Sequence, residues 1–138
     1  MSAKDKFHEE VKRSLIKDQW TVTDDPLKIK SGGKRFEIDF GAERLIFADR
    51  GLEKIAIEVK SFLNPSAMTD FYGAMGQFLA YRLALRAEQP ERVLYLAVPD
   101  DAYRTFFQSQ FIQTAIQEYS LLLIVYDPDH EVITQWIN

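Results

Sequence analysis

An uninterrupted apolar run, Val93 to Val98, constrains the fold of this chain more than any other segment. Such a run without polar alternation is typical of a strand that is covered on both faces, as in a parallel sheet. It follows a long helical segment, residues 66–88, which ends at Pro90. Another strand, residues 53–62, precedes that helix. The three segments predict a strand–helix–strand unit whose two strands lie parallel.

The remaining segments predict further helices and strands around this unit. Phe7, Val11 and Leu15 recur every four residues, which predicts the buried stripe of an N-terminal helix with Ser2 as its cap. Apolar periodicity and turn residues predict the bounds of the elements. The expected helices are residues 3–18 and a helical region 101–119, which a break near Ser109 can divide. The expected strands are 20–23, 27–30, 34–40, 45–48, 121–126 and 131–137, and strands 27–30 and 34–40 form a hairpin around Ser31-Gly32-Gly33.

Strand 34–40 is expected to place Phe36, Ile38 and Phe40 on one face and Glu37 and Asp39 on the other, since strand residues alternate between faces. Together the elements predict an α/β fold, a mixed sheet flanked by helices, in one domain over residues 1–138. No internal repeat, low-complexity stretch or linker interrupts it.

Composition excludes several classes of protein. With 46% apolar and 13% aromatic residues the chain can bury a core, and with no cysteine it forms neither disulfides nor thiolate zinc sites. No apolar run approaches the roughly 18–20 residues that span a bilayer, and the N-terminus lacks the apolar stretch of a signal peptide, so we expect a cytoplasmic protein with no membrane partner. The net charge of −4 argues against a broad phosphate-binding surface but not against a local one.

The tripeptide Glu58-Val59-Lys60 is where chemistry is expected. Residues two apart on a strand point to the same face, so Glu58 and Lys60 lie side by side. A second copy of the pattern, Glu10-Val11-Lys12, lies in the N-terminal helix, where residues two apart do not face each other. Two interpretations stay open for the strand copy: a metal site, or an ion pair that contributes little to stability.

An acid from an earlier strand completes the pattern. Asp39 is the favoured residue, and Glu43 is the alternative. The order helix, three strands, helix, strand with D…E-x-K resembles the restriction-endonuclease-like, or PD-(D/E)xK, nuclease fold over residues 3–98. The chain departs from that pattern at Ile38, where the family usually has proline, and in the long spacing from Asp39 to Glu58. The resemblance implies an α-β-β-β-α-β core, followed here by C-terminal helices and a hairpin.

A site of this kind binds Mg²⁺ (or Mn²⁺), which prefers hard oxygen ligands and keeps several waters. The expected ligands are the carboxylates of Asp39 and Glu58 and the backbone carbonyl of Val59. The metal lowers the pKa of a bound water and stabilises charge on the phosphate. Lys60 would orient that water and offset the developing charge.

The nuclease resemblance suggests further site residues. Gln77 and Tyr81 share a face of helix 66–88, and a Q-x-x-x-Y pattern after E-x-K lies near the site in several such nucleases; an ordinary helix surface is the alternative. Related nucleases also place an acid of the first helix near the metal, which suggests His8 or Glu9, with a solvated acidic face as the alternative.

One local basic cluster lies in the predicted hairpin. It consists of Lys28, Lys30, Lys34 and Arg35. These side chains are candidates for contact with a phosphate backbone, and a solvated hairpin is the alternative.

The chain is also similar, nearly end to end, to the XisH family, the cyanobacterial excision controlling factors of the fdxN element. The segments that carry this similarity are residues 4–8, 15–20, 39–43, 57–62, 70–72, 76–78, 94–100 and 135–137. The resemblance implies a cyanobacterial source and a role in site-specific DNA excision, alongside a recombinase and a small factor, XisI.

Three hypotheses follow for the activity. The first is a Mg²⁺-dependent endonuclease centred on Asp39, Glu58 and Lys60. The second is a non-catalytic DNA- or recombinase-binding accessory protein that keeps the nuclease fold. The third is a nuclease toxin restrained by XisI. A homodimer is expected because related nucleases often pair.

Overall fold

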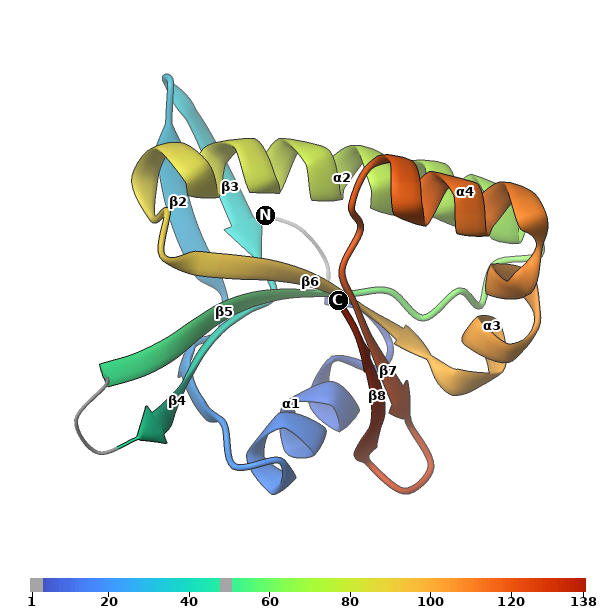
Figure 1. The fold of residues 1–138 in the computed structure, drawn as a ribbon, viewed down its shortest axis with the longest axis horizontal. Coiled ribbons are helices and arrows are strands. Elements are labelled where there is room, and N and C mark those ends of the chain that lie inside the picture. Colours follow the sequence, from blue (N-terminus) through green and yellow to red (C-terminus); the bar gives the residue numbers. More distant parts are fainter. Residues whose placement is uncertain (1–3, 48–50) are drawn as a thin grey trace.

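The computed structural model describes residues 4–47 and 51–138, which form a mixed sheet with helices on both faces (Figure 1). The helices are α1 (His8–Lys17), α2 (Ala67–Glu88), α3 (Asp100–Arg104) and α4 (Gln110–Glu118), with a 3₁₀ turn η1 (Phe106–Gln108). The strands are β1 (Thr21–Asp24), β2 (Leu27–Ser31), β3 (Lys34–Ile38), β4 (Phe40–Phe47), β5 (Gly51–Val59), β6 (Arg92–Pro99), β7 (Leu123–Asp127) and β8 (Val132–Ile137). The predicted arrangement of a mixed sheet flanked by helices is confirmed.

Six strands form the main sheet in the order β1-β4-β5-β6-β7-β8, and β2 and β3 form a separate hairpin. The three central strands β5, β6 and β7 run parallel, while β1, β4 and β8 run antiparallel to their neighbours. The predicted parallel pairing across helix 66–88 is therefore confirmed. Residues 94–99 of β6 are buried, as expected of a strand with a helix on each side.

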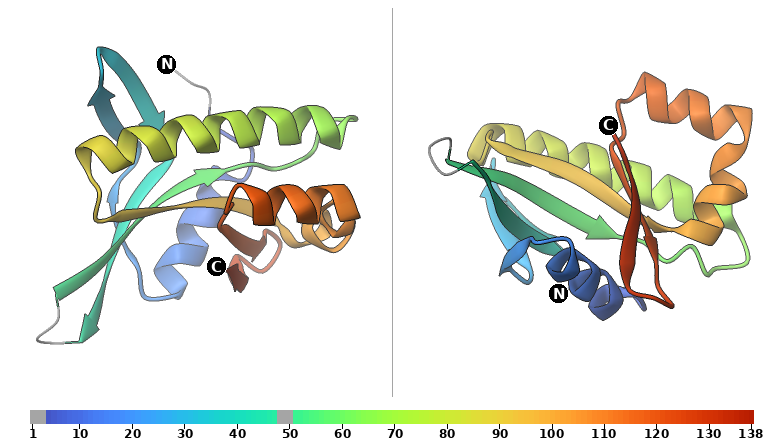
Figure 2. Two further views of the ribbon diagram at one scale, coloured as in Figure 1. Left: turned by 45° about the horizontal axis from the view of Figure 1, so that its top comes forward. Right: turned by 60° about the horizontal axis from the view of Figure 1, so that its bottom comes forward.

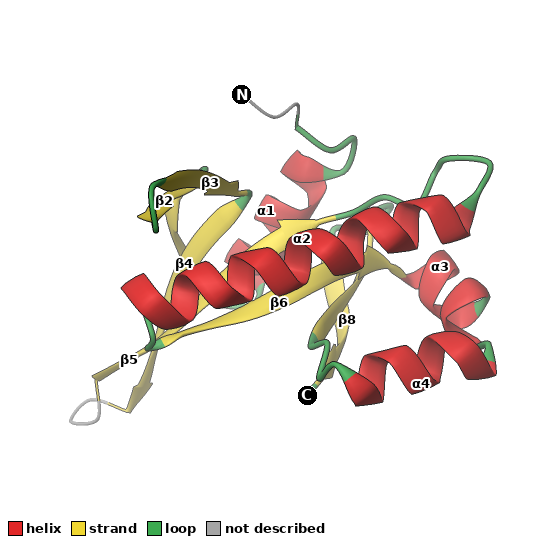
Figure 3. Ribbon diagram, turned by 90° about the horizontal axis from the view of Figure 1, so that it is seen from above, coloured by secondary structure: helices red, strands yellow, loops and turns green. Residues whose placement is uncertain are grey.

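The two faces of the sheet are covered by different elements. Figure 3 shows α2 lying over β5 and β6, with the β2–β3 hairpin beside it, and Figure 2 shows α1 on the opposite face. Successive side chains of β5 point to opposite faces, so this strand contributes to both cores. Ala56 packs in the core on the α2 side, and Ile57 and Val59 pack in the core on the α1 side. Val11 and Leu15 of α1 are fully buried against that second core.

The first helix begins later than predicted. It starts at His8 rather than Ala3 because Asp5 lies in a turn before it, where its Oδ1 accepts a hydrogen bond from the Phe7 amide at 3.0 Å. The other carboxylate oxygen of Asp5 accepts from the amide of Ser61, just after β5, also at 3.0 Å. The residues before the helix are thus joined to the sheet instead of continuing the helix. The predicted cap, Ser2, lies outside the described residues.

The predicted strand 34–40 is divided at Asp39. Residues 34–38 form β3, which pairs with β2, and Phe40 begins β4, which pairs with β1 and β5. The prediction that Phe36, Ile38 and Phe40 share one face was therefore wrong. Ile38 and Phe36 pack in the α2-side core, and Phe40 packs in the α1-side core, because the bend at Asp39 reverses the alternation.

The other boundaries lie close to their predicted positions. The predicted strand 45–48 is the end of the longer β4, and the helical region 101–119 is broken at Ser109, which caps α4. Gly32 and Gly33 turn the β2–β3 hairpin with positive φ angles of 55° and 80°, which glycine adopts without strain. Within the described residues, no helix is both long and apolar enough to cross a membrane.

Replacing Leu15 with alanine tests the core beneath α1. Leu15 is fully buried, so Leu15→Ala should lower the free energy of unfolding by about 2–5 kcal/mol through lost burial and a residual cavity. The adjacent Ile16 is 53% exposed, and Ile16→Ala should change stability by only about 0.5 kcal/mol. Urea unfolding of both variants measures the difference, and equal losses would contradict the assigned face of α1.

Candidate functional site

Asp39 and Glu58 meet where the chain passes from β3 into β4. The backbone amide of Asp39 donates to Glu58 Oε1 at 3.2 Å, and the backbone amide of Val59 donates to Asp39 Oδ2 at 2.8 Å. Each carboxylate therefore accepts a hydrogen bond from the backbone beside the other. The structure brings together the two acids that the sequence favoured, although they are 19 residues apart.

Lys60 lies beside this pair at the end of β5. Its Nζ is 3.9 Å from Glu58 Oε2, and the Lys60 side chain is 26% exposed against 9% for that of Glu58. Strand geometry explains the placement, because Glu58 and Lys60 point to the same side of β5. The ammonium group is thus close to the Glu58 carboxylate and partly open to solvent.

Burial makes both carboxylates less acidic. Glu58 is only 7% exposed, and its removal from water, together with the charge of Asp39, raises its pKa to about 8. Lys60 opposes this shift without cancelling it. Burial also raises the pKa of Asp39, against the hydrogen bond from Val59 and the charge of His8. Near neutral pH the pair therefore tends to retain a proton when no cation is bound.

His8 reaches the site from α1. The imidazole is 3% exposed and packs on the ring of Phe40, with centroids 4.3 Å apart. Its Nδ1 lies 3.6 Å from Asp39 Oδ1 and has no hydrogen-bond partner among the described residues. Its Nε2 is 2.8 Å from Asp25 Oδ1. Of the two residues suggested on the first helix, His8 is the one that the structure places next to Asp39.

Asp25 was missed by the sequence reasoning, and it lies between the predicted strands 20–23 and 27–30. It accepts from Lys12 Nζ at 2.9 Å in addition to its contact with His8. Although burial opposes the shift, the hydrogen bonds from Lys12 and His8 lower the pKa of Asp25. Ligand atoms of His8, Glu9 and Asp25 all lie within 4.8 Å of one another. No local signal identifies Asp25, because it is 17 residues from His8.

A small cavity lies on this side of the site. It has a volume of about 110 Å³, and its lining includes His8, Asp25, Glu37 and Asp39. A cavity of this size is large enough for a water molecule, and the polar side chains in its lining offer hydrogen-bond partners.

Tyr81 approaches the two acids from α2. Burial, followed by the negative charges of Glu58, Asp39 and Glu37, raises the pKa of Tyr81 to about 12. Its ring packs edge-on against Phe36 at 6.2 Å. Gln77, one turn earlier on α2, has a buried Oε1 without a hydrogen-bond partner among the described residues. Tyr81 is therefore close enough to Asp39 and Glu58 for their charges to raise its pKa. The side-chain oxygen of Gln77 can accept a hydrogen bond from an additional group.

Glu43, the alternative to Asp39, is not brought to Glu58. In the antiparallel register Glu43 pairs with Lys54, while Phe40 pairs with Ile57. Lys54 is four residues before Glu58 on β5, a separation of roughly 13 Å along a strand. Register thus distinguishes two acids that the sequence left open.

The basic cluster lies on the β2–β3 hairpin. Lys30 pairs with Arg35, Lys28 pairs with Glu37, and Lys34 lies next to the turn. All four basic side chains are exposed. Lys28, Lys30 and Arg35 share the outward face because the buried Leu27 and Ile29 take the alternate positions of β2. Three of the four predicted residues therefore form one surface, and Lys34 points to the other face.

The donor set suits a hard divalent cation. Two carboxylates meet with raised pKa values, and a cation in place of the retained proton would relieve their repulsion. The Val59 amide contacts Asp39, whereas the Val59 carbonyl stays a predicted ligand. The alternative of an isolated surface ion pair does not describe the arrangement, since Glu58 is buried and contacts Asp39 as well as Lys60.

A family model and two solved structures point to the same protein family. A family model described as XisH protein matches residues 1–134. Two solved structures are similar, an XisH family protein from Nostoc punctiforme PCC 73102 and a fdxN element excision controlling factor protein from Anabaena variabilis. Each is 52% identical, covers 96% of this chain and 98% of its own, and superposes with a TM-score of 0.88. No curated protein matches the sequence.

The raised pKa of Glu58 predicts an unusual dependence of stability on pH. Between its ordinary pKa of 4.5 and its folded value of about 8, the folded protein binds a proton that the unfolded chain has released. The metal-free protein should therefore lose stability as pH rises from about 5 to 8, by on the order of a few kcal/mol relative to Glu58→Gln. Urea unfolding in EDTA across this range measures it.

Glu43→Gln is the matched control, because it removes a carboxylate from the same face of the sheet without touching Asp39. It should follow the wild-type pH dependence. Parallel pH profiles for the wild type and Glu58→Gln would show that Glu58 is not the titrating group.

Proposed function

The chain belongs to the XisH family, and on this premise we propose that it acts in the control of site-specific DNA excision as a Mg²⁺- or Mn²⁺-dependent endonuclease that hydrolyses phosphodiester bonds. The excision role rests on the name of the Anabaena variabilis relative, a fdxN element excision controlling factor. The nuclease activity rests on a single observation in this chain. The Asp39 amide donates to the Glu58 carboxylate, and the Val59 amide donates to the Asp39 carboxylate, beside Lys60.

We assign the chain to the PD-(D/E)xK superfamily as part of this proposal. Helix α1, the antiparallel strands that lead to β5, helix α2 and the parallel strand β6 follow the element order of that fold. The acid at the start of β4 and the E-x-K segment at the end of β5 occupy the matching positions. The absent proline before Asp39 does not prevent the acids from meeting, because the bend at Asp39 brings them together.

Asp39 and Glu58, with the carbonyl of Val59, would hold the divalent cation. When bound, the cation supplies a more acidic water and stabilises negative charge on the phosphate. His8 packs against Asp39 from the α1 side and limits the space in which that carboxylate can turn. The cavity beside His8 is lined in part by Asp39.

Lys60 and the α2 residues would act on the substrate side of the acids. The Lys60 ammonium can hold the attacking water by hydrogen bonding and offset charge at the scissile phosphate. Tyr81 lies near both carboxylates, and the buried Gln77 oxygen is available to accept a hydrogen bond. Both are proposed as positioning residues.

The outward face of the β2–β3 hairpin would contact the DNA backbone. Lys28, Lys30 and Arg35 present three cations there, and Lys34 adds a fourth at the tip. Glu37 lies on the same face, next to Lys28, and is also among the charges that act on Tyr81. The hairpin therefore begins beside the two acids and carries the basic side chains away from them, where they could bind the DNA on either side of the cleaved bond.

A non-catalytic accessory role is the second candidate. The net charge of −4 favours it, because a few basic residues alone give a limited phosphate-binding surface. In either role we propose DNA, a site-specific recombinase and a small XisI-type protein as partners, and a homodimer as the assembly. Restraint of a nuclease by XisI remains a variant of the first candidate.

Cleavage assays decide between the two candidates. With Mg²⁺ or Mn²⁺, the protein should nick supercoiled plasmid or branched DNA. Lys60→Ala should lower the rate by about 10²–10³-fold, the usual cost of one charge-stabilising donor. Lys54→Ala is the matched control, because Lys54 lies on the same strand and face but pairs with Glu43. Activity that survives Lys60→Ala would place the chemistry elsewhere, and inactive wild type that still binds DNA would favour the accessory role.

Metal binding provides an independent test. Calorimetry should show Mg²⁺ or Mn²⁺ binding with a Kd of roughly tens of micromolar or weaker, as expected for a site with only two carboxylate ligands. Binding should be tighter at pH 8.5 than at pH 6, because the cation competes with the proton that Glu58 retains. Glu58→Ala should abolish the heat and Glu43→Gln should preserve it. Equal heats from wild type and Glu58→Ala would count against the site.

A further inference from the structure

A large cavity lies away from the two acids, where the parallel strands β5, β6 and β7 end. It is a groove of about 560 Å³, within the range of roughly 300–1,000 Å³ that ligand sites occupy. Ser61 and Phe62 follow β5, Asp100 follows β6 and Asp127 ends β7. Carboxyl ends of parallel strands are the usual place for a binding crevice in an open α/β sheet.

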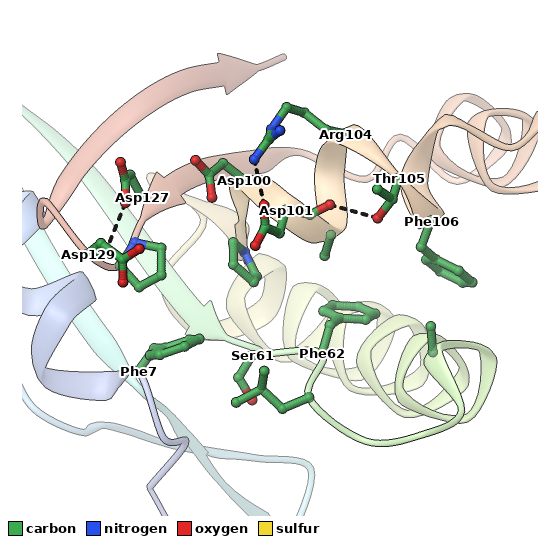
Figure 4. A pocket seen from close by; sticks show the side chains of 15 residues that line it. Phe7, Ser61, Phe62, Asp100, Asp101, Arg104, Thr105, Phe106, Asp127 and Asp129 are labelled. Carbon is green, nitrogen blue, oxygen red and sulfur yellow. Dashed lines mark hydrogen bonds and ion pairs between the residues drawn. The ribbon is translucent and has the colours of Figure 1, made fainter.

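Figure 4 shows that the groove has two unlike walls. One wall presents the rings of Phe7, Phe62 and Phe106, and Leu63, also a lining residue, is 55% exposed. The other wall presents acids from the start of α3 and from the turn after β7. These acids are Asp100, Asp101, Asp127 and Asp129. An occupant must therefore combine apolar surface with positive charge.

Two of the four acids are already used within the chain. Asp101 pairs with Arg104. Asp127 accepts hydrogen bonds from the His130 ring and from the amides of Asp129 and His130. The carboxylates of Asp100 and Asp129 have no such partner among the residues that the structure describes. They leave two negative charges for an incoming group.

We propose that this groove binds a basic segment of a protein partner, through an arginine or lysine side chain flanked by apolar residues. The carboxylates would repel the phosphates of DNA, so the groove does not extend the nucleic-acid surface. A free inorganic cation would satisfy the acids but leave the aromatic wall exposed. A guanidinium or ammonium group can pair with Asp100 and Asp129 while its aliphatic stem and neighbours cover the rings.

The groove is continuous with the strand end that carries Lys60. Ser61, which lines the groove, directly follows Lys60, and its amide is held by Asp5. The hydroxyl of Tyr126 donates to the Lys60 carbonyl at 3.2 Å. A partner in the groove would therefore contact the residue next to Lys60. The binding proposal itself does not depend on cleavage, and it stands if the protein proves to be non-catalytic.

Random twelve-residue peptides displayed on phage are the probe. Selection on the full chain should enrich sequences with arginine or lysine beside leucine or aromatic residues. A synthetic peptide of the enriched sequence should bind about tenfold more weakly to Asp100→Asn/Asp129→Asn in fluorescence anisotropy. Leu63→Ser, which changes the apolar wall at an exposed position, should also weaken binding several-fold.

Glu91→Gln/Glu118→Gln is the matched control, since it removes two exposed carboxylates away from the groove. It should bind the peptide like wild type, and circular dichroism checks that each variant is folded. Enriched peptides without a cation, no enrichment, or equal loss in both double variants would overturn the proposal. Duplex DNA that binds Asp100→Asn/Asp129→Asn more weakly than wild type would also overturn it, because the groove would then face nucleic acid.

Discussion

The Asp39 carboxylate accepts a hydrogen bond from the Val59 amide, and the Asp39 amide donates one to the Glu58 carboxylate. These two bonds fix the point at which the chain leaves the β2–β3 hairpin and enters the main sheet. Because Asp39 bonds to β5 through its side chain, the strand bends there and the residues after it face the other core. The hairpin can therefore pack against α2, and it extends beyond the main sheet (Figure 1). The same two hydrogen bonds of Asp39 thus set the position of the acids, the direction of the hairpin and the division between the two cores.

Such a pair is a poor choice for stability alone. Burial raises the pKa of both acids, and apolar residues of similar volume would cost less to bury. Among the described residues, His8 Nδ1 beside Asp39 and Gln77 Oε1 on α2 also have no hydrogen-bond partner. Destabilising polar groups that gather at one point of an otherwise well-packed core are typical of a site kept for function. The carboxylates, the imidazole and the ammonium therefore support the cation site that we propose above.

The parts of this arrangement that local pattern controls could be predicted. The apolar run in β6 gives the parallel pairing, and strand alternation places Glu58 beside Lys60. The bend at Asp39 could not be predicted, because it depends on a side chain that bonds to a backbone 20 residues away. Asp25 was missed for a similar reason, since its contact with His8 joins a turn to a helix. The choice between Asp39 and Glu43 required the register of β4 against β5, which two strand-like segments alone do not specify.

The net charge does not describe the binding surfaces of this molecule, because its basic and acidic side chains lie in different places. The hairpin presents cations on one side of the acids, and the groove at the ends of the parallel strands presents carboxylates. Lys60 and Ser61 are consecutive, yet one faces Glu58 and the other lines the groove. A partner that shifts Ser61 therefore acts on a backbone that also holds Lys60. By linkage, any such effect of the partner on DNA affinity must be matched by an equal effect of DNA on partner affinity. If both proposals hold, one strand end would couple the proposed protein-binding groove to the proposed phosphate-binding site.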